Sequence, residues 1–105
     1  MMITVDFSKQ DSTLFSGRKN GERARHNLMK KTGEAFDDQR MNFLSREGQL
    51  ITSSYFLGLL GEYLHQFNNM NDVFNYIDLN GLDRRSKEEC IRALRRGATR
   101  SEDIF

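Results

Sequence analysis

Residues 41–67, MNFLSREGQLITSSYFLGLLGEYLHQF, decide the fold that we expect for this chain. The segment contains a short apolar strand, expected at 40–45, then a polar turn, and then the hydroxyl side chains of Thr52, Ser53 and Ser54. Apolar residues then recur three and four positions apart, the spacing of one helical face, at Phe56, Leu59, Leu60, Tyr63, Leu64 and Phe67. Thr52 or Ser53 is a natural N-cap for this helix. The segment therefore predicts a strand that leads into an amphipathic helix.

The start of this helix is the strongest candidate for a functional site. Free backbone N–H groups and the positive end of the helix dipole stabilise an anion or a phosphate at such a position. The simpler interpretation is that the hydroxyls only cap the helix, which is worth about 1 kcal/mol and needs no function.

The rest of the chain continues an alternation of strands and helices. Ile3, Val5 and Phe7 alternate with polar residues, as in a half-buried strand. The other expected elements are a loop at 8–17, a helix at 18–32, a strand at 73–79, a turn at 80–81 and a last helix that opens on a capping box at 86–89. This order is typical of an α/β domain.

Size and composition indicate one domain in a reducing compartment. A chain of 105 residues fits a single core, which we place at 1–98, followed by a flexible tail at 99–105. No apolar run reaches the roughly 18 residues of a membrane span, and the N-terminus lacks the pattern of a secretion signal. Cys90 is the only cysteine, which excludes an internal disulfide. We therefore expect a cytoplasmic protein with no membrane contact.

Charge is segregated along the chain although the net charge is only +1. The candidate basic surface consists of two groups, an early one and a late one: Arg18, Lys19, Arg23, Arg25, Arg92, Arg95 and Arg96. Between Glu47 and Asp83 there is no Lys or Arg. Such segregation can steer a charged partner onto one face, although two basic surface helices would look the same.

Residues 43–64, FLSREGQLITSSYFLGLLGEYL, resemble the strand–loop–helix signature of STAS domains, the fold of anti-sigma-factor antagonists. They are more similar still to a bacterial STAS-like domain family of unknown function, which commonly has a Ser-Ser-Phe-Leu type helix start; here it reads Ser53-Ser54-Tyr55-Phe56-Leu57. Many members also carry a Gly/Arg-rich segment before the first helix, which 16–25, SGRKNGERAR, matches. The resemblance extends over 2–96 and implies a small STAS-like sheet with helices mainly on one face.

The resemblance also implies a function, which is to dock onto another protein without catalysis. In anti-sigma-factor antagonists a GHKL-type kinase phosphorylates a serine at this helix start, and by position Ser54 matches that serine and Ser53 the residue before it. This chain departs from their pattern at Thr52, where they have Asp, and at Tyr55, where they have Gly. The expected docking surface consists of Thr52, Ser53, Ser54, Tyr55 and Gly58, and the expected partner is a kinase-like or anti-sigma-like regulator.

Other motifs give weaker predictions. Residues 17–25 lack the Gly-Lys-Ser/Thr ending of a nucleotide-binding P-loop. His26 and His65 have no second ligand at metal spacing, Cys90 falls on the apolar side of the last helix, and no catalytic triad is evident. We therefore expect no enzyme activity, no cofactor and no metal.

Two further functions stay open. Small size and segregated charge suit an inhibitor of a protein partner, such as a phage anti-defence or toxin-immunity protein, equally well. Binding of nucleic acid through the basic C-terminal helix is a weaker alternative, because the net charge is near zero.

The aromatic residues of the third expected strand bear on self-association. Phe74 and Tyr76 would be open to a partner or a homodimer if the sheet were covered on one side only, and they would be core if it were covered on both. The sequence slightly favours the core.

Overall fold

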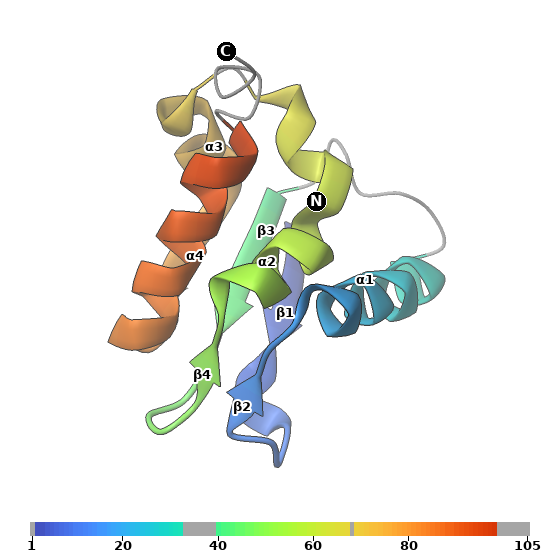
Figure 1. The fold of residues 1–105 in the computed structure, drawn as a ribbon, viewed down its shortest axis with the longest axis vertical. Helices are drawn as coiled ribbons and strands as arrows, with labels where there is room; N and C mark the ends of the chain where they lie inside the picture. Colours follow the sequence, from blue (N-terminus) through green and yellow to red (C-terminus); the bar gives the residue numbers. More distant parts are fainter. Residues whose placement is uncertain (1, 33–39, 68, 99–105) are drawn as a thin grey trace.

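The computed structural model describes residues 2–32, 40–67 and 69–98 (Figure 1). The tail expected at 99–105 lies outside these residues. In chain order the elements are β1 (Met2–Asp6), the 3-10 helix η1 (Phe7–Lys9), β2 (Leu14–Phe15), α1 (Arg18–Thr32), β3 (Arg40–Leu44), β4 (Leu50–Ile51), α2 (Ser53–Leu60), the 3-10 helix η2 (Gly61–Gln66), α3 (Met70–Tyr76), β5 (Ile77–Gly81) and α4 (Arg84–Ala98).

The main sheet is parallel and has the strand order β1-β3-β5. β1 aligns Ile3 with Met41 and Val5 with Phe43 of the central strand β3. β5 aligns Ile77 with Met41 on the other side, with an irregularity between Asn42 and Leu44. A separate short pair, β2 and β4, is also parallel. The predicted α/β class is confirmed, and the helix at 18–32 lies where the sequence placed it. The expected first strand exists as β1, but Phe7 begins η1 and is not part of it.

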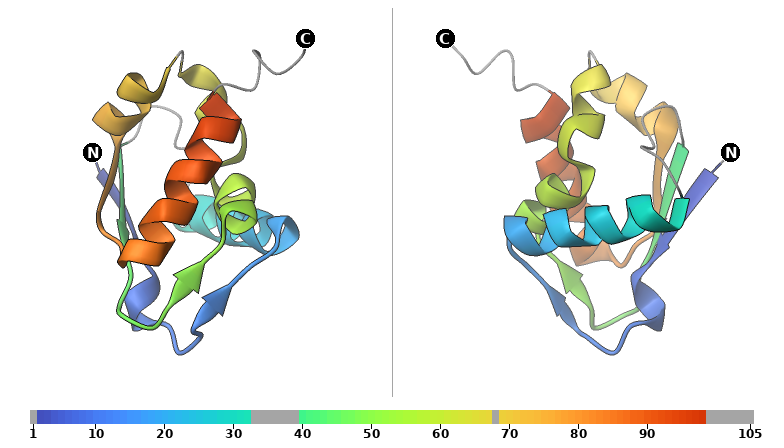
Figure 2. Two further views of the ribbon diagram at one scale, coloured as in Figure 1. Left: turned by 60° about the vertical axis from the view of Figure 1, so that its left-hand side comes forward. Right: turned by 90° about the vertical axis from the view of Figure 1, so that its right-hand side faces the viewer.

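Helices cover one face of the main sheet. Figure 2 shows α1, α2 and α4 on the same side of the three strands. Alternate strand residues point toward them and are buried, namely Ile3, Met41, Phe43, Ile77 and Leu79. Residues between them, such as Thr4, Asp78 and Asn80, are exposed on the opposite face. A parallel sheet is usually covered on both faces, so this polar second face is unusual and agrees with the one-sided arrangement that we expected.

Two glycines bring α1 and α2 into backbone contact. A Cβ atom at Gly21 would overlap the carbonyl oxygen of Tyr55, and one at Gly58 would overlap the carbonyl oxygen of Arg18. Any larger residue at either position would force the helices apart. We call this contact the glycine crossing; it fixes the position of α2 over the sheet.

The sequence prediction failed at the third strand. Residues 70–76 form helix α3, and β5 begins only at Ile77 and continues through the expected turn to Gly81. The cause is a cap, because the side-chain oxygen of Asn69 accepts a hydrogen bond from the backbone N–H of Asp72 at 3.0 Å.

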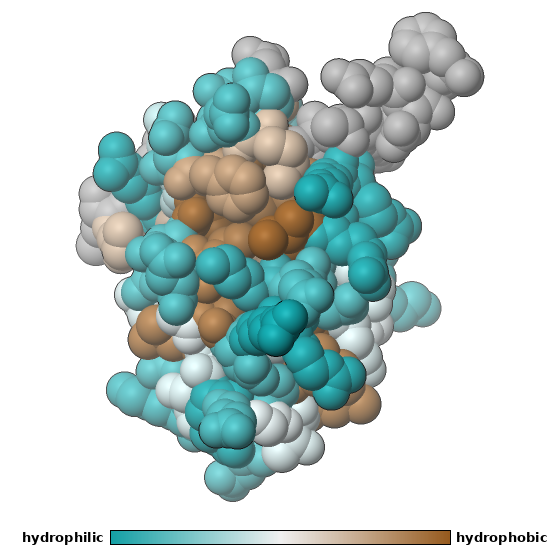
Figure 3. Space-filling model, turned by 90° about the vertical axis from the view of Figure 1, so that its left-hand side faces the viewer, coloured by the Kyte–Doolittle hydropathy of each residue, from teal (hydrophilic) through white to brown (hydrophobic). Residues whose placement is uncertain are grey.

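The residues of α3 are also more exposed than the sequence favoured. Phe74 is 45% exposed and Tyr76 is 37% exposed. Figure 3 faces the side of the molecule that carries α3 and α4, and apolar residues gather near its centre.

Three other expectations are corrected. The helix after Thr52 is α-helical only to Leu60 and continues as η2, because Gly61 at its end has a φ of 50°. The loop expected at 8–17 contains β2, which pairs with the equally unexpected β4. The capping box at 86–89 does not exist, because α4 begins at Arg84 and Ser86 is buried inside its first turn.

Candidate functional site

The site lies at the junction where β4 ends and α2 begins. Thr52 is the N-cap, and its hydroxyl accepts a hydrogen bond from the backbone N–H of Tyr55 at 3.3 Å. The same hydroxyl lies 3.2 Å from the hydroxyl of Ser54. The backbone N–H of Thr52 donates to the carbonyl of Phe15 at 2.9 Å, which ties the junction to β2. The capping prediction is therefore confirmed at Thr52.

An internal carboxylate occupies the N-terminus of α2. The backbone N–H of Ser53 donates to Oε1 of Glu89 at 2.9 Å, and Oε2 of Glu89 accepts from Nη1 of Arg92 at 2.7 Å. A carboxylate is stabilised at this end of a helix by the dipole and by the free N–H groups. The anion that the sequence predicted for this position is thus supplied by α4, and Arg92 holds it in place.

A second side chain of α4 supports the junction from inside. The hydroxyl of Ser86 accepts from the backbone N–H of Ile51 at 3.1 Å and donates to the carbonyl of Gln49 at 3.3 Å. Sequence reasoning missed both Ser86 and Glu89 because it assigned them to a cap of their own helix. Their spacing of three residues, which sets them on one face of α4, was the available signal.

The structure separates the five expected docking residues into two groups. Thr52, Ser53 and Ser54 are partly exposed. Tyr55 is only 7% exposed, and its ring lies 6.0 Å from that of Phe7 and 5.8 Å from that of Phe15. Burial also raises the pKa of the Tyr55 hydroxyl.

Gly58 is buried in the glycine crossing. Its backbone lies close to that of Arg18 in α1, which leaves no room for a partner at this glycine. Tyr55 and Gly58 are therefore removed from the docking surface, because their atoms are used in the interior.

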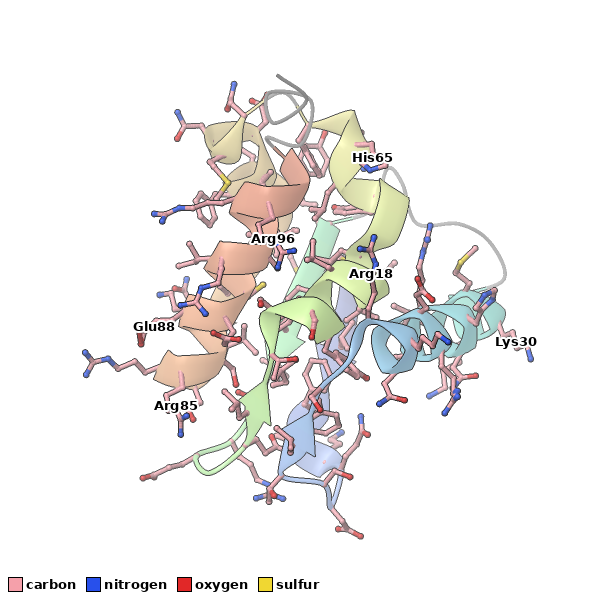
Figure 4. All side chains as sticks on the ribbon, in the orientation of Figure 1. Arg18, Lys30, His65, Arg85, Glu88 and Arg96 are labelled. Atoms are coloured by element: carbon pink, nitrogen blue, oxygen red, sulfur yellow. The ribbon has the colours of Figure 1, made fainter. Side chains whose placement is uncertain are left out.

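A shallow cavity of about 230 Å³ adjoins Glu89. It is lined by Leu50, Arg85, Glu88, Glu89 and Arg92. Figure 4 shows Arg85 and Glu88 projecting outward from the first turns of α4. The surface beside the start of α2 is therefore charged, and it carries both signs.

A second cavity, of about 290 Å³, lies beside the early basic group, and none of the three arginines of the late group lines it. Its lining includes Arg18 and Arg25 from α1, His65 from η2 and Gly97 from α4. Figure 4 shows Arg18 and Arg96 directed toward the α2–η2 segment from opposite sides. Of the seven candidate basic residues, Arg25 is half-buried and Arg18, Lys19, Arg23, Arg92, Arg95 and Arg96 are exposed.

Among the described residues, no group of three or more His, Cys, Asp or Glu side chains could hold a metal ion. Cys90 is a free, buried thiol whose pKa is raised by burial. In the same part of the chain no helix is long and apolar enough to cross a membrane.

Comparison of the chain with protein-family models, with curated proteins and with solved structures found no match. The function proposed for the chain therefore has to be argued from the residues and contacts of this site.

Proposed function

We propose that this chain is a non-enzymatic, STAS-like regulatory module of the cytoplasm that docks onto a partner protein at the start of α2, and that phosphorylation of Ser54 or Ser53 weakens the docking. One observation carries the proposal. Ser53 and Ser54 are partly exposed at the N-terminus of α2, and the first backbone N–H of that helix, at Ser53, is bonded at 2.9 Å to the carboxylate of Glu89 from α4.

A phosphate at this place would compete with Glu89. A phosphoserine carries a charge of about −1.5 to −2 and favours the same N–H groups and the same arginine that the carboxylate now binds. Glu89 would then be repelled from Ser53 or would lose Arg92 to the phosphate. Since Ser53 and Ser54 are not core residues, this rearrangement changes the surface without removing the packing that holds the fold.

The charge around the site favours an acidic partner surface. Arg92, Arg95 and Arg96 are exposed on α4, next to Glu89 or further along the same helix. Opposite charges speed encounter and fix orientation, whereas an added phosphate would neutralise part of this attraction. A kinase-like or anti-sigma-like regulator fits this role, in keeping with the resemblance of residues 43–64 to STAS domains.

The test compares charge at Ser54 with the same charge elsewhere. The tagged full chain is expressed in its native host as wild type, Ser54→Glu, Ser54→Ala and the control Ser12→Glu, whose side chain is exposed in the loop before β2. We expect the wild type, Ser54→Ala and Ser12→Glu to capture the same partner, and Ser54→Glu to capture it at least about tenfold less while keeping its thermal midpoint.

The intact mass of the native chain completes this test. A form heavier by one phosphate in some growth state supports the switch. Equal capture by Ser54→Glu and Ser12→Glu would contradict the docking surface itself. Stoichiometric capture of a toxin or defence protein, with an unmodified mass in every state, would replace the switch with the inhibitor function.

A further inference from the structure

The cavity of about 290 Å³ that is bordered by α1, α2, η2 and the end of α4 is a second candidate site, which we call the arginine cavity. Arg18 and Arg25 line it from α1, and His65 lines it from η2. Its volume is close to the lower end of the range for small-molecule sites, about 300–1,000 Å³. The arginine cavity is therefore large enough for a small ligand, and its charged lining is mainly cationic.

A glycine makes room for one of these cations. A Cβ atom at Gly61 would lie only 2.5 Å from Nη1 of Arg25, so the guanidinium occupies the space that a side chain at this position would fill. Gly61 is the C-cap of α2, and the end of a helix where the carbonyls are free stabilises a positive charge. The end of α2 thus holds the guanidinium of Arg25 beside the cavity.

The charge of Arg25 is not compensated within the described chain. Its side chain is half-buried, and its Nε is buried without a hydrogen-bond partner. Among the described residues no carboxylate forms an ion pair with it. A guanidinium is always charged and has five N–H donors, and a buried donor without a partner lowers stability. Because Nε is enclosed, a ligand would reach this cation through the outer nitrogens of the guanidinium.

The carboxylate of Glu22 also lines the cavity, and it is only weakly paired. Its Oε2 lies 3.9 Å from Nε of Arg18, and the side chains of Arg18 and Glu22 are 62% and 55% exposed. An exposed pair of this kind contributes little and is screened by salt. Two arginines against one carboxylate leave the cavity with a positive excess, which favours an anion.

We infer that the arginine cavity binds a phosphate group, either as free phosphate or as the phosphate monoester of a small molecule. A phosphate ester carries a charge of about −1.5 to −2 and three acceptor oxygens, and arginine N–H groups form strong, charge-assisted hydrogen bonds with such oxygens. Leu57 is half-buried and lines the same cavity, so it offers an apolar contact to the carbon atoms of an ester. The inference does not rest on the proposed docking function.

The test is an NMR titration of the full, isotope-labelled chain with inorganic phosphate and with phenyl phosphate, at an ionic strength held constant with sodium chloride. We expect saturable shifts at the amides of Gly58, Gly61 and Gly97, which line the cavity, with a Kd of about 1 mM or tighter for at least one probe. Tighter binding of phenyl phosphate would identify an ester as the ligand, and equal binding would identify free phosphate.

Three variants test the residues. Arg25→Met removes the guanidinium, and we expect it to raise the Kd at least about tenfold. The control Arg23→Met removes the same charge from an exposed side chain of α1 that does not line the cavity, and it should change the Kd by less than about twofold. Glu22→Gln removes the carboxylate beside the cavity and should tighten binding by about two- to threefold.

Circular dichroism checks the fold of each variant. Glu22 is exposed, so Glu22→Gln keeps the inference testable if Arg25→Met does not fold. Shifts that do not saturate with either probe up to about 20 mM would overturn the inference. Equal weakening by Arg25→Met and Arg23→Met would also overturn it, because it would show a general attraction of anions to a basic helix. Unchanged or weaker binding by Glu22→Gln would contradict the charge balance on which the inference rests.

Discussion

The glycine crossing and the β5 edge differ in how far their backbone and apolar atoms are covered by the rest of the chain. At the crossing, Gly21 and Gly58 allow two helices to touch through their backbones, and no room remains for another group. Along β5 no strand of the described chain pairs with the outer edge, and Phe74 of the neighbouring helix α3 stays 45% exposed. The first region is closed and should serve stability, whereas the second is open and should contribute little to it.

Helix α4 lies between the two kinds of surface. Ser86 and Glu89 reach β4 and the start of α2, while Lys87 and Ile91 line a groove of about 510 Å³ beside β5. One helix therefore borders both the charged junction at the start of α2 and the groove beside β5. Substitutions on the closed side should lower stability, and those on the open side should leave it unchanged.

The largest effect is expected at the glycine crossing. Gly58→Ala places a Cβ atom against the carbonyl of Arg18, and backbone cannot move aside as a side chain can. We expect the free energy of unfolding to fall by about 3 kcal/mol or more in urea titrations. The control is Asn27→Ala on the exposed face of α1, which should change it by less than about 0.5 kcal/mol. Equal stability of the two variants would show that the crossing is not tightly closed.

The next largest effect is expected at Gln49, which is 2% exposed. Its Nε2 donates to the carbonyls of Phe7 at 2.7 Å and Ser12 at 3.0 Å, and its Oε1 accepts from the N–H of Arg46 at 3.0 Å. Gln49→Leu leaves these groups without their partner and should cost about 2–3 kcal/mol in thermal or urea unfolding. Gln10→Ala, at an exposed side chain of the loop whose carbonyls Gln49 binds, is the matched control, and a similar loss in both would refute this role of Gln49.

A pH-dependent effect is expected from Cys90. Burial raises the pKa of its thiol above the ordinary value of 9.0, so above that pH the unfolded chain loses a proton that the folded protein keeps. Stability should therefore be complete below about pH 9 and fall above it, at most by about 1.4 kcal/mol per pH unit. The thiol-free variant Cys90→Ala should give a flatter curve in urea titrations between about pH 8 and pH 10. Parallel curves would mean that the thiol is not protected in the folded state.

The smallest effect on stability is expected on the open side. Phe74→Ser removes an exposed ring and should change the unfolding free energy of dilute protein by less than about 0.5 kcal/mol. The neighbouring Val73 is 0% exposed, and Val73→Ala should cost about 2 kcal/mol. A loss at Phe74 as large as that at Val73 would remove the distinction between the two regions.

The sequence predicted those features that depend on local patterns. The alternation of Ile3 and Val5 gave the first strand, helix formers gave α1, and the hydroxyl of Thr52 gave the cap of α2. The aromatic and β-branched residues of 70–76 misled the prediction, because β propensity reflects context and Asn69 caps a helix there.

The remaining features depend on contacts between distant parts of the chain. Ser86 meets Ile51 across 35 positions, and Glu89 meets Ser53 across 36. The burial of Tyr55 and Gly58 likewise follows from the positions of η1, β2 and α1, which the spacing of apolar residues in α2 does not encode. The position of the polar junction at the start of α2 could be predicted from the sequence, but the α4 side chains that bond to it could not.

The most direct test of the central claim is hydrogen exchange of the full chain, alone and bound to its captured partner, read at the start of α2 and along β5. The account predicts that the partner slows exchange of the N–H groups of residues 53–56 and of α4 near Glu89, and leaves the protection of Asn80 at a fixed chain concentration unchanged. A partner that protects β5 and leaves residues 53–56 unaffected would contradict the assignment of the docking surface.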